Sequence, residues 1–297
     1  MALTPSTTDE LLVEQHDRIA LITLNRPDRF NAISRDMLDE LSKKVVEANK
    51  DPDIRCIVLT GAGKGFCSGL DLIGVSEGGI GSGDSKGTNR PARQLFDLRD
   101  APINVMWNID TPMICALNGP AAGYGMDLTL LCDMRIASTT AKMAAVTAKR
   151  NVVPESGGTW LLPRLVGWAK AAEIVFTGRS LSAADCLELG LVSRVVPDEL
   201  LLEHATALAR RMARLPANQL MMMKLLVNQT VENMGLASSR LLGTLFDGIA
   251  RHTQEGLDFV RRAQEVGFRQ AVRERDDPFG DYGSRPRPGK EIGRAHV

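Results

Sequence analysis

Residues 118–133 read NGPAAGYGMDLTLLCD, and this stretch sets the organisation of the chain. An extended apolar run, residues 112–117, precedes it, three glycines interrupt the pattern, and Met126, Leu130 and Leu131 then recur at helical spacing. The pattern predicts a strand, a glycine turn and the start of a helix. Glycines at such a junction let the backbone approach a ligand, and the first N–H groups of a helix carry the positive end of its dipole. We expect an anion, or an oxygen that develops negative charge, to bind there.

Asp127 lies in the first turn of this predicted helix, where its side chain can reach the same ligand. An acidic residue in that position also gains roughly 0.3–1 kcal/mol from the helix dipole without any catalysis. The stretch alone therefore leaves two roles open for Asp127, as a catalytic group and as a structural acid at a helix start.

Composition excludes several classes of protein. The 297-residue chain is long enough to bury a large core, as one domain or two. Its 36 acidic and 36 basic residues balance, so we predict neither nucleic acid nor an anionic membrane as a partner. No apolar run approaches membrane-spanning length, and the N-terminus lacks the pattern of a signal peptide. The five cysteines form no CxxC pair and predict reduced core thiols, which favours a cytoplasmic location.

The first sixty residues carry local signals for three elements. Residues 11–24 contain two strand-like runs around a polar turn and predict a hairpin. Ser34 is a favourable N-cap for the helix that follows, with Ile33 and Leu38 placed as a hydrophobic staple. Residues 55–60 form a short apolar run rich in β-branched side chains and predict a buried strand.

A second glycine-rich turn, GAGKGFCSGLD at residues 61–71, follows that strand directly. It fits neither a dinucleotide fingerprint nor a P-loop, because glycines that these motifs require are missing and Lys64 is followed by Gly65 instead of Ser or Thr. Ser68 lacks the glycine two residues before it that a nucleophile elbow needs. Residues 74–90 are rich in Gly and Ser, and they predict either a mobile lid over a site or a plain surface insertion.

Short strands alternate with helices through residues 1–197, which we interpret as the core. Residues 198–276 show helical pattern only and predict a helical oligomerisation region, while residues 277–297 are polar, rich in Pro and Gly, and predict a flexible tail. The methionine run at residues 221–223 favours packing in the core or at a subunit interface over a ligand surface. The helical region has three expected breaks, near Pro216, Gly235 and Gly256.

Four blocks of sequence, in this order, resemble the enoyl-CoA hydratase/isomerase (crotonase) superfamily: NRPDRFNAI, IVLTGAGKGFCSGLDL, NGPAAGYGMDLTLLCDMRIAS and VVPESGGTWLLPRLVGWAKAAEIVFTGRSLSAADCLELGLVSRVV. The resemblance extends over residues 11–268. It implies an α/β fold built as a crotonase-like spiral of ββα turns, with a C-terminal helical trimerisation region. It also implies a homotrimer or dimer of trimers, an acyl-CoA thioester as substrate, and no permanently bound cofactor, since coenzyme A enters as part of the substrate.

The resemblance further implies an oxyanion hole of two backbone N–H groups that hold the thioester carbonyl oxygen, here those of Leu70 and Tyr124. Each of the two glycine turns follows a strand, so we expect the turns to converge on one oxygen. Arg29 is either a phosphate ligand or a solvated loop arginine. The substrate- and CoA-binding positions that the resemblance implies are Arg29, Phe30, Ala32, Ser68, Asp71, Leu72 and Gly123.

The acid and base depart from the pattern of the family's hydratases, which hold a water between two glutamates. The first position is Asp127 here, and the second aligns with Thr147, which cannot act as an acid or base near neutral pH. Glu155 resembles the position at which several family isomerases carry a single acidic base, and it is otherwise an acid at a helix N-terminus. Asp127 and Glu155 are therefore the predicted catalytic residues, as a pair or with one working base.

We expect an enzyme that hydrates or isomerises the double bond of an enoyl-CoA through an enolate, in fatty or aromatic acid breakdown. A C–C bond hydrolase or decarboxylase on the same fold would explain Thr147, and a non-catalytic CoA-ester or RNA binder is a third possibility. No metal site is predicted, because the four histidines show no ligand spacing: His16, His204, His252 and His296.

Overall fold

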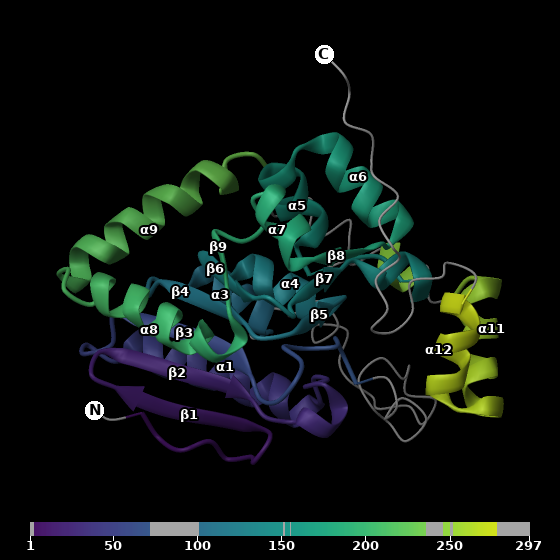
Figure 1. The fold of residues 1–297 in the computed structure, drawn as a ribbon, viewed down its shortest axis with the longest axis horizontal. Helices are drawn as coiled ribbons and strands as arrows, with labels where there is room; N and C mark the ends of the chain where they lie inside the picture. Colours follow the sequence, from purple (N-terminus) through teal and green to yellow (C-terminus); the bar gives the residue numbers. More distant parts are fainter. Residues whose placement is uncertain are drawn as a thin grey trace, which may run out of the picture.

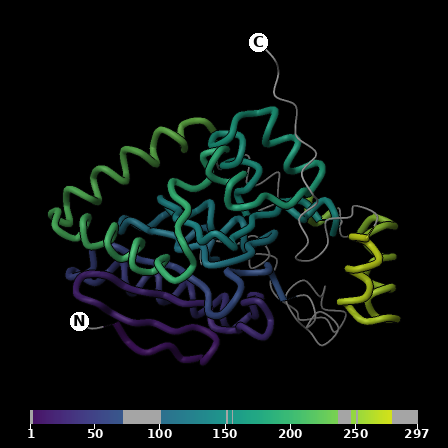
Figure 2. The backbone as a smooth tube through the Cα atoms, in the orientation of Figure 1, coloured from purple at the N-terminus to yellow at the C-terminus, as the bar shows by residue number. Residues whose placement is uncertain are grey.

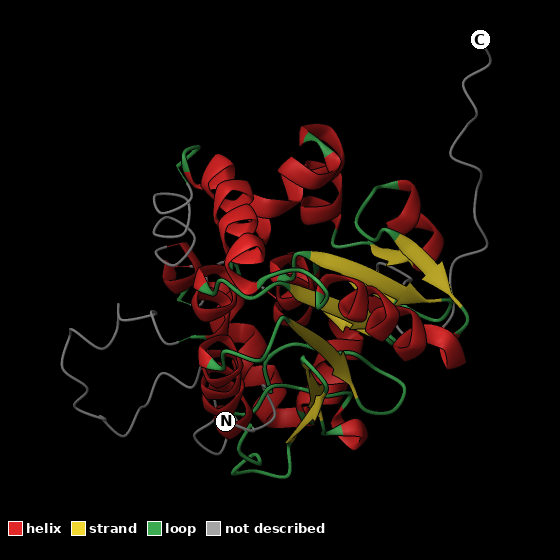
Figure 3. Ribbon diagram, turned by 90° about the vertical axis from the view of Figure 1, so that its left-hand side faces the viewer, coloured by secondary structure: helices red, strands yellow, loops and turns green. Residues whose placement is uncertain are grey.

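The computed structural model describes residues 3–71, 101–150, 152–154, 156–235, 246–249 and 252–277. A six-stranded sheet has the order β1-β2-β3-β4-β6-β9, and a second sheet of three short strands has the order β5-β7-β8. Figure 3 shows the strands in yellow with helices packed around them. The β1–β2 and β7–β8 pairs are antiparallel and all other neighbours are parallel. The strands are β1 (Leu11–His16), β2 (Ile19–Leu24), β3 (Cys56–Gly61), β4 (Met113–Leu117), β5 (Pro120–Ala122), β6 (Met134–Ser138), β7 (Lys142–Ala144), β8 (Ser180–Ser182) and β9 (Arg194–Val196).

Helices surround the sheets, which confirms the predicted α/β class (Figure 1). The α-helices are α1 (Arg35–Lys50), α3 (Pro102–Asn108), α4 (Tyr124–Leu131), α5 (Gly158–Val166), α6 (Trp168–Thr177), α7 (Ala183–Glu188), α8 (Leu201–Met212), α9 (Ala217–Glu232), α11 (Gln254–Val266) and α12 (Phe268–Asp276). Short 3-10 helices are η1 (Pro27–Arg29), η3 (Val146–Arg150) and η4 (Asp198–Leu200).

The six-stranded sheet separates two hydrophobic clusters, because side chains alternate between the faces of a strand. On one face Ile22 packs in a large cluster that includes Leu41 of α1. On the other face Ile19 packs in a smaller cluster with Ala205 of α8. Helix α8 is the first long helix of the predicted helical region, residues 198–276, yet it completes the core of the central sheet (Figure 1).

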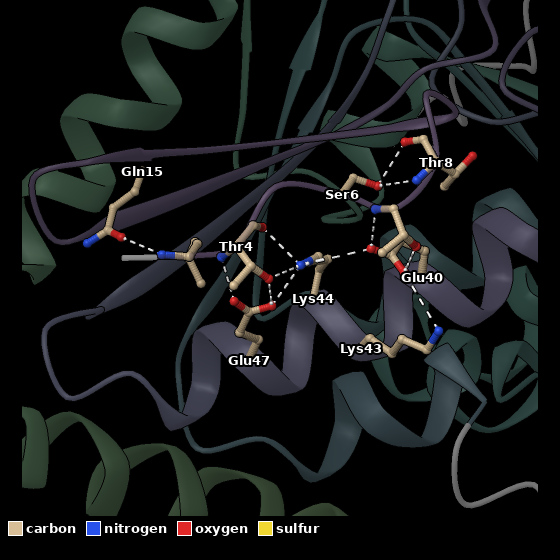
Figure 4. A network of polar contacts seen from close by, with 10 residues as sticks. Thr4, Ser6, Thr8, Gln15, Glu40, Lys43, Lys44 and Glu47 are labelled. Atoms are coloured by element: carbon tan, nitrogen blue, oxygen red, sulfur yellow. Dashed lines mark hydrogen bonds and ion pairs between the residues drawn. The ribbon is translucent and has the colours of Figure 1, made fainter. Parts of the chain in front are cut away.

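Local predictions for the first sixty residues are confirmed. Strands β1 and β2 form the antiparallel hairpin, and every residue of β3 is buried. The Oγ of Ser34 accepts a hydrogen bond from the N–H of Met37 at 3.0 Å, as expected for the N-cap of α1. The segment before β1 is held on α1 by polar contacts. Thr7 donates to both carboxylate oxygens of the buried Glu40, at 2.9 and 2.8 Å, and Nζ of Lys44 donates to the carbonyl of Thr4 at 2.9 Å (Figure 4).

The C-terminal helices lie at opposite sides of the molecule, with α9 on one side and the α11–α12 pair on the other (Figures 1 and 2). Nζ of Lys224 joins α9 to the core by a 3.0 Å ion pair with Asp133 Oδ2. Arg150 of η3 forms a two-pronged ion pair with Asp276 of α12, with 2.7 Å between Nη2 and Oδ2. These contacts tie both parts of the helical region to the strand-containing core.

The structure refines two predictions for the helical region. The break expected near Gly256 lies just before it, at residues 252–253, and Gly256 itself lies in the first turn of α11, whose N-cap is Thr253. A break that was not predicted separates α11 from α12 at Gly267, where φ is +83°. Of the methionine run, Met222 and Met223 are exposed, which excludes the core of this chain for these two side chains.

Four sequence predictions fall on residues outside the described ranges: the segment 74–90, Leu72, Glu155 and the tail from residue 278. All five cysteines lie within the described ranges, where they are buried and free. No helix in the described ranges combines the length and apolarity needed to cross a membrane.

Candidate active site

The two glycine turns lie side by side. A parallel bridge joins Cys67 to Ala121, and the N–H of Ala122 donates to the carbonyl of Cys67 at 3.0 Å. Helix α4 then begins in close contact with the same segment. A Cβ added to Gly125 would lie only 2.2 Å from the Cys67 carbonyl oxygen, so the two backbones can approach this closely only with glycine at position 125. The predicted strand, glycine turn and helix of residues 118–133 are thus confirmed, and they pack on the second turn.

This packing brings the two predicted oxyanion donors into one neighbourhood. Leu70 forms a parallel bridge with Ile33, in which the N–H of Ile33 donates to Gly69 and the N–H of Asp71 donates to Ile33. Because the bridge uses the groups on either side of Leu70, the N–H of Leu70 itself points away from Ile33. A Cβ added to Gly69 would lie 3.7 Å from the backbone nitrogen of Tyr124, which places that nitrogen beside the Leu70 turn.

Cys67 lies within the same turn but does not suit nucleophilic chemistry. Its Sγ accepts a hydrogen bond from the N–H of Gly69 at 3.4 Å. Burial raises the pKa of the Cys67 thiol to about 12, so the thiol stays protonated near neutral pH.

Two asparagine side chains that sequence reasoning missed hold the first part of the second turn. Nδ2 of Asn31 donates to the carbonyls of Ala62 and Gly65, at 2.9 and 2.7 Å. Asn118 reaches the turn from the other strand, where Oδ1 accepts from the N–H of Gly61 at 3.1 Å and Nδ2 donates to Gly65 at 3.1 Å. The sequence offered one signal for this role, the location of the two asparagines: Asn31 lies in the loop before α1, and Asn118 directly follows β4.

Asp127 lies in the first turn of α4, as predicted, and only 7% of its surface is exposed. Its carboxylate faces Gly158, the first residue of α5: a Cβ added there would lie 2.2 Å from Oδ1. The carboxylate therefore lies at the positive end of the α5 dipole. In the sequence, Gly158 follows Glu155, the second predicted carboxylate, by three positions.

Thr147 lies on η3, which borders the first turn. The neighbouring Val146 has its Cγ2 3.5 Å from the position of a Cβ added to Gly123, and the N–H of Gly123 donates to Ala144 at 3.0 Å. Oγ1 of Thr147 is buried and has no hydrogen-bond partner among the described residues. A buried hydroxyl without a partner typically costs about 1–3 kcal/mol, so a bound water or ligand atom would stabilise it.

Three of the predicted CoA-side residues form an exposed rim next to the Leu70 turn. Ser68 Oγ donates to the carbonyl of Arg29 at 3.2 Å, and the N–H of Ser68 donates to the carbonyl of Phe30 at 2.9 Å. The Phe30 side chain is largely exposed, at 51%. Ala32, by contrast, is buried, and its carbonyl accepts a hydrogen bond from Nη1 of Arg26 at 2.7 Å.

Arg29 also faces the C-terminal helices across an open groove. Arg29 and its neighbour on η1, Asp28, line one side of this groove. From the far side it is lined by residues at the α11–α12 junction and on α12: Val266, Gly267, Phe268, Arg269, Gln270 and Arg273. Three arginines against one aspartate give the groove a positive charge, which suits phosphate groups. Sequence reasoning missed the contribution of α12, because nothing local to that helix links it to residue 29.

Asp71, predicted to contact the substrate, is engaged elsewhere. Its Oδ2 lies 2.9 Å from Nη2 of Arg26, and the same guanidinium lies 3.0 Å from Glu10 Oε1. Within the described ranges, no group of three His, Cys, Asp or Glu side chains is placed to hold a metal ion.

Comparison with known proteins agrees with this geometry. A family model described as enoyl-CoA hydratase/isomerase matches residues 14–266. The chain belongs to the enoyl-CoA hydratase/isomerase family. This assignment confirms the family and the fold that the four sequence blocks predicted.

Relatives of this family member carry both hydratase and isomerase names. A probable enoyl-CoA hydratase of Mycobacterium bovis is 32% identical over 277 residues, which cover 92% of this chain and 98% of the relative. The 1,2-epoxyphenylacetyl-CoA isomerase of Escherichia coli K12 is 36% identical over 215 residues, or 72% of this chain and 80% of the relative. The crystal structure of an enoyl-CoA hydratase from Mycobacterium smegmatis superposes with a TM-score of 0.82 at 36% identity, covering 94% of this chain and 97% of that one. The chain thus has the crotonase fold.

Proposed function

We propose that this enzyme polarises the carbonyl of an acyl-CoA thioester between the backbone N–H groups of Leu70 and Tyr124. The single observation that supports this most strongly is the proximity of the two turns, with the Tyr124 nitrogen 3.7 Å from the position of a Cβ on Gly69. Two donors aimed at one oxygen stabilise the enolate that forms when a neighbouring C–H loses its proton. Removal of one such donor typically costs about 2.7–4 kcal/mol of transition-state stabilisation.

The carboxylates suit isomerisation of a carbon–carbon double bond. One carboxylate takes a proton from one carbon of the enoyl chain and returns it to another, so a single working base is enough. Thr147, at the second glutamate position of the hydratases, supports this reaction over hydration by two glutamates. Hydration is the second candidate, because Asp127 and Glu155 together supply two carboxylates. The name of the M. bovis relative supports hydration, while the name of the E. coli relative supports an isomerase that acts on an acyl-CoA thioester, in that case an epoxide.

Coenzyme A enters as part of the substrate, and we propose no permanently bound cofactor. The positive groove of Arg29, Arg269 and Arg273 supports binding of its phosphates, with Phe30 and Ser68 on the adjoining rim. Gly123 and Leu72 remain proposed substrate contacts, because Gly123 directly precedes Tyr124 and Leu72 is two positions after Leu70.

A homotrimer, or a dimer of trimers, is the proposed assembly. Helix α9 exposes a series of large apolar side chains that a second copy of the chain would cover: Met222, Met223, Leu225, Leu226 and Val227. Water-exposed apolar surface of this kind favours association. The five buried free thiols support a reducing, cytoplasmic location.

The decisive experiment supplies α,β-enoyl-CoA and β,γ-enoyl-CoA separately in deuterated water and follows product mass and retention time. A deuterated isomer identifies isomerisation, and an added water identifies hydration. Release of a carboxylate or carbon dioxide from diketone or malonyl-type esters, without enoyl-CoA turnover, would instead establish the hydrolase or decarboxylase alternative. Tight binding of CoA esters without exchange of the α-proton would establish a binder. Asp127→Asn and Glu155→Gln assign the roles, and full activity in both variants would refute the proposed acid/base residues.

A further inference from the structure

The guanidinium of Arg26 is held in a fixed orientation by three partners. Nε pairs with Glu10 at 3.0 Å, Nη2 pairs with Asp71 at 2.9 Å, and Nη1 donates to the carbonyl of Ala32 at 2.7 Å. The backbone N–H of the same residue donates to Oδ1 of Asn31 at 2.8 Å. A planar guanidinium with all three nitrogens engaged fixes the direction in which each partner lies.

Asp71 is the partner that connects this arrangement to the proposed oxyanion hole. It follows Leu70 directly, and its side chain is 15% exposed. Backbone bonds hold both neighbours of Leu70 on Ile33: the N–H of Ile33 donates to Gly69 at 2.8 Å, and the N–H of Asp71 donates to Ile33 at 2.9 Å. The ion pair with Arg26 adds a side-chain anchor at the Asp71 end of this two-bond clasp.

The other end of the clasp is conformationally permissive. Gly69 has a φ of +103°, a region that favours glycine, and glycine leaves neighbouring peptide planes free to rotate. The Leu70 N–H shares a peptide plane with the Gly69 carbonyl, which accepts from Ile33, so its direction depends on how firmly both ends of this clasp stay on Ile33, and Asp71 is the second end. Glu10 offers a contrast, because it binds the same guanidinium from the segment before β1 and has no place in the Leu70 turn.

We infer that Arg26 and Asp71 are positioning residues for the oxyanion hole, which hold the Leu70 N–H in the direction that the enolate oxygen requires. This inference rests on the proposed function, which gives that N–H its role. In this role both side chains act through the backbone of the Leu70 turn and not through a contact with the substrate. Because a misplacement of about 1 Å at a reacting centre can cost on the order of 100-fold in rate, release of Asp71 should affect turnover more than substrate affinity.

The test compares Asp71→Asn with Glu10→Gln in the full-length enzyme. Each variant removes one carboxylate charge from the same guanidinium and nearly preserves side-chain shape. For Asp71→Asn we expect kcat for α-proton exchange to fall at least about tenfold with KM changed less than about twofold. The infrared C=O stretch of bound, ¹³C-labelled acyl-CoA should also shift less to low frequency than in the wild type. Glu10→Gln should change both measurements less than Asp71→Asn does, because Glu10 is not part of the Leu70 turn.

The outcomes separate this inference from the proposed function. A wild-type enzyme that leaves the carbonyl frequency of bound thioester unshifted would refute the oxyanion hole itself. A wild-type shift that persists in Asp71→Asn, or that Glu10→Gln reduces equally, would overturn the positioning role and leave Arg26 as a structural ion-pair partner. If Asp71→Asn folds poorly, Arg26→Lys answers the same question: it keeps the charge but loses the fork, so it should reduce both kcat and the carbonyl shift.

Discussion

Replacement of Gly158 by alanine should disable Asp127 without disturbing the backbone. The new Cβ would lie 2.2 Å from Oδ1 of Asp127. A carbon and an oxygen in contact are about 3.3 Å apart, so the carboxylate must retreat by about 1 Å. A displacement of this size at a reacting centre costs on the order of 100-fold in rate. Gly158 has no positive φ, and alanine in place of glycine favours a helix by about 1 kcal/mol, so the helix start itself tolerates the change.

The assay is exchange of the enoyl-CoA α-proton in deuterated water, read by mass spectrometry as kcat/KM, with the thermal unfolding midpoint measured on the same preparations. Gly158→Ala should lower kcat/KM by about 100-fold. Asp127→Asn serves as the reference, because it removes the charge but keeps the shape. If the methyl group acts only through Asp127, the double variant should be no slower than Asp127→Asn alone.

Two results would refute this reasoning. A folded Gly158→Ala enzyme with the wild-type rate would show that the carboxylate of Asp127 is not held at a reacting position. A further drop of about 100-fold when Gly158→Ala is added to Asp127→Asn would show that the methyl group acts through another part of the site.

Other parts of the molecule give four further predictions. Leu226→Lys, at a side chain 70% exposed in the single chain, should yield a smaller species by sedimentation with unchanged circular dichroism, and an unchanged mass would contradict the α9 interface. Asn31→Ala should lower the free energy of unfolding in urea by about 2–4 kcal/mol, because the buried carbonyls of the second glycine turn lose their donors; a change below about 0.5 kcal/mol would contradict the clamp. Arg273→Gln should raise KM for CoA thioesters about tenfold but leave turnover of N-acetylcysteamine thioesters, which lack the phosphates, unchanged. Equal effects on both substrates would place Arg273 outside a phosphate site. Burial opposes ionisation of Glu40, but hydrogen bonds from Thr7 and the charge of Lys44 hold its pKa below the usual 4.5. The free energy of unfolding of the wild type should therefore approach that of Glu40→Gln as the pH falls from about 7 to about 3. A difference that stays constant with pH would refute the assignment.

Elements whose signals are local could be predicted from the sequence. The hairpin, the Ser34 cap and the glycine turn before α4 each depend on neighbouring residues, and glycine identity alone marked both turns. Contacts between distant segments could not be predicted in this way. Asp127 contacts Gly158, and Asn31 donates hydrogen bonds to the second turn, only because the fold brings these distant segments together.

The helical region illustrates the same limit. The break expected near Gly256 is present, but Thr253 caps α11 three residues earlier, so Gly256 itself lies in the first turn of that helix. The break at Gly267 was missed, although glycine in a left-handed conformation is a common way for a helix to end. The second sheet was missed because its three-residue strands are too short to establish an alternating pattern.

The ion pair between Arg150 and Asp276 has a consequence for the order in which the enzyme becomes competent during synthesis. The two residues are 126 positions apart, and α12 supplies one wall of the groove that faces Arg29. At about 5–20 residues per second, a ribosome needs roughly 6–25 s to reach Asp276 after Arg150. Through that interval the nascent chain contains both glycine turns but lacks α12, one wall of the proposed phosphate groove. Under the proposed function, binding of the nucleotide end of the substrate therefore requires the final helix that the structure describes.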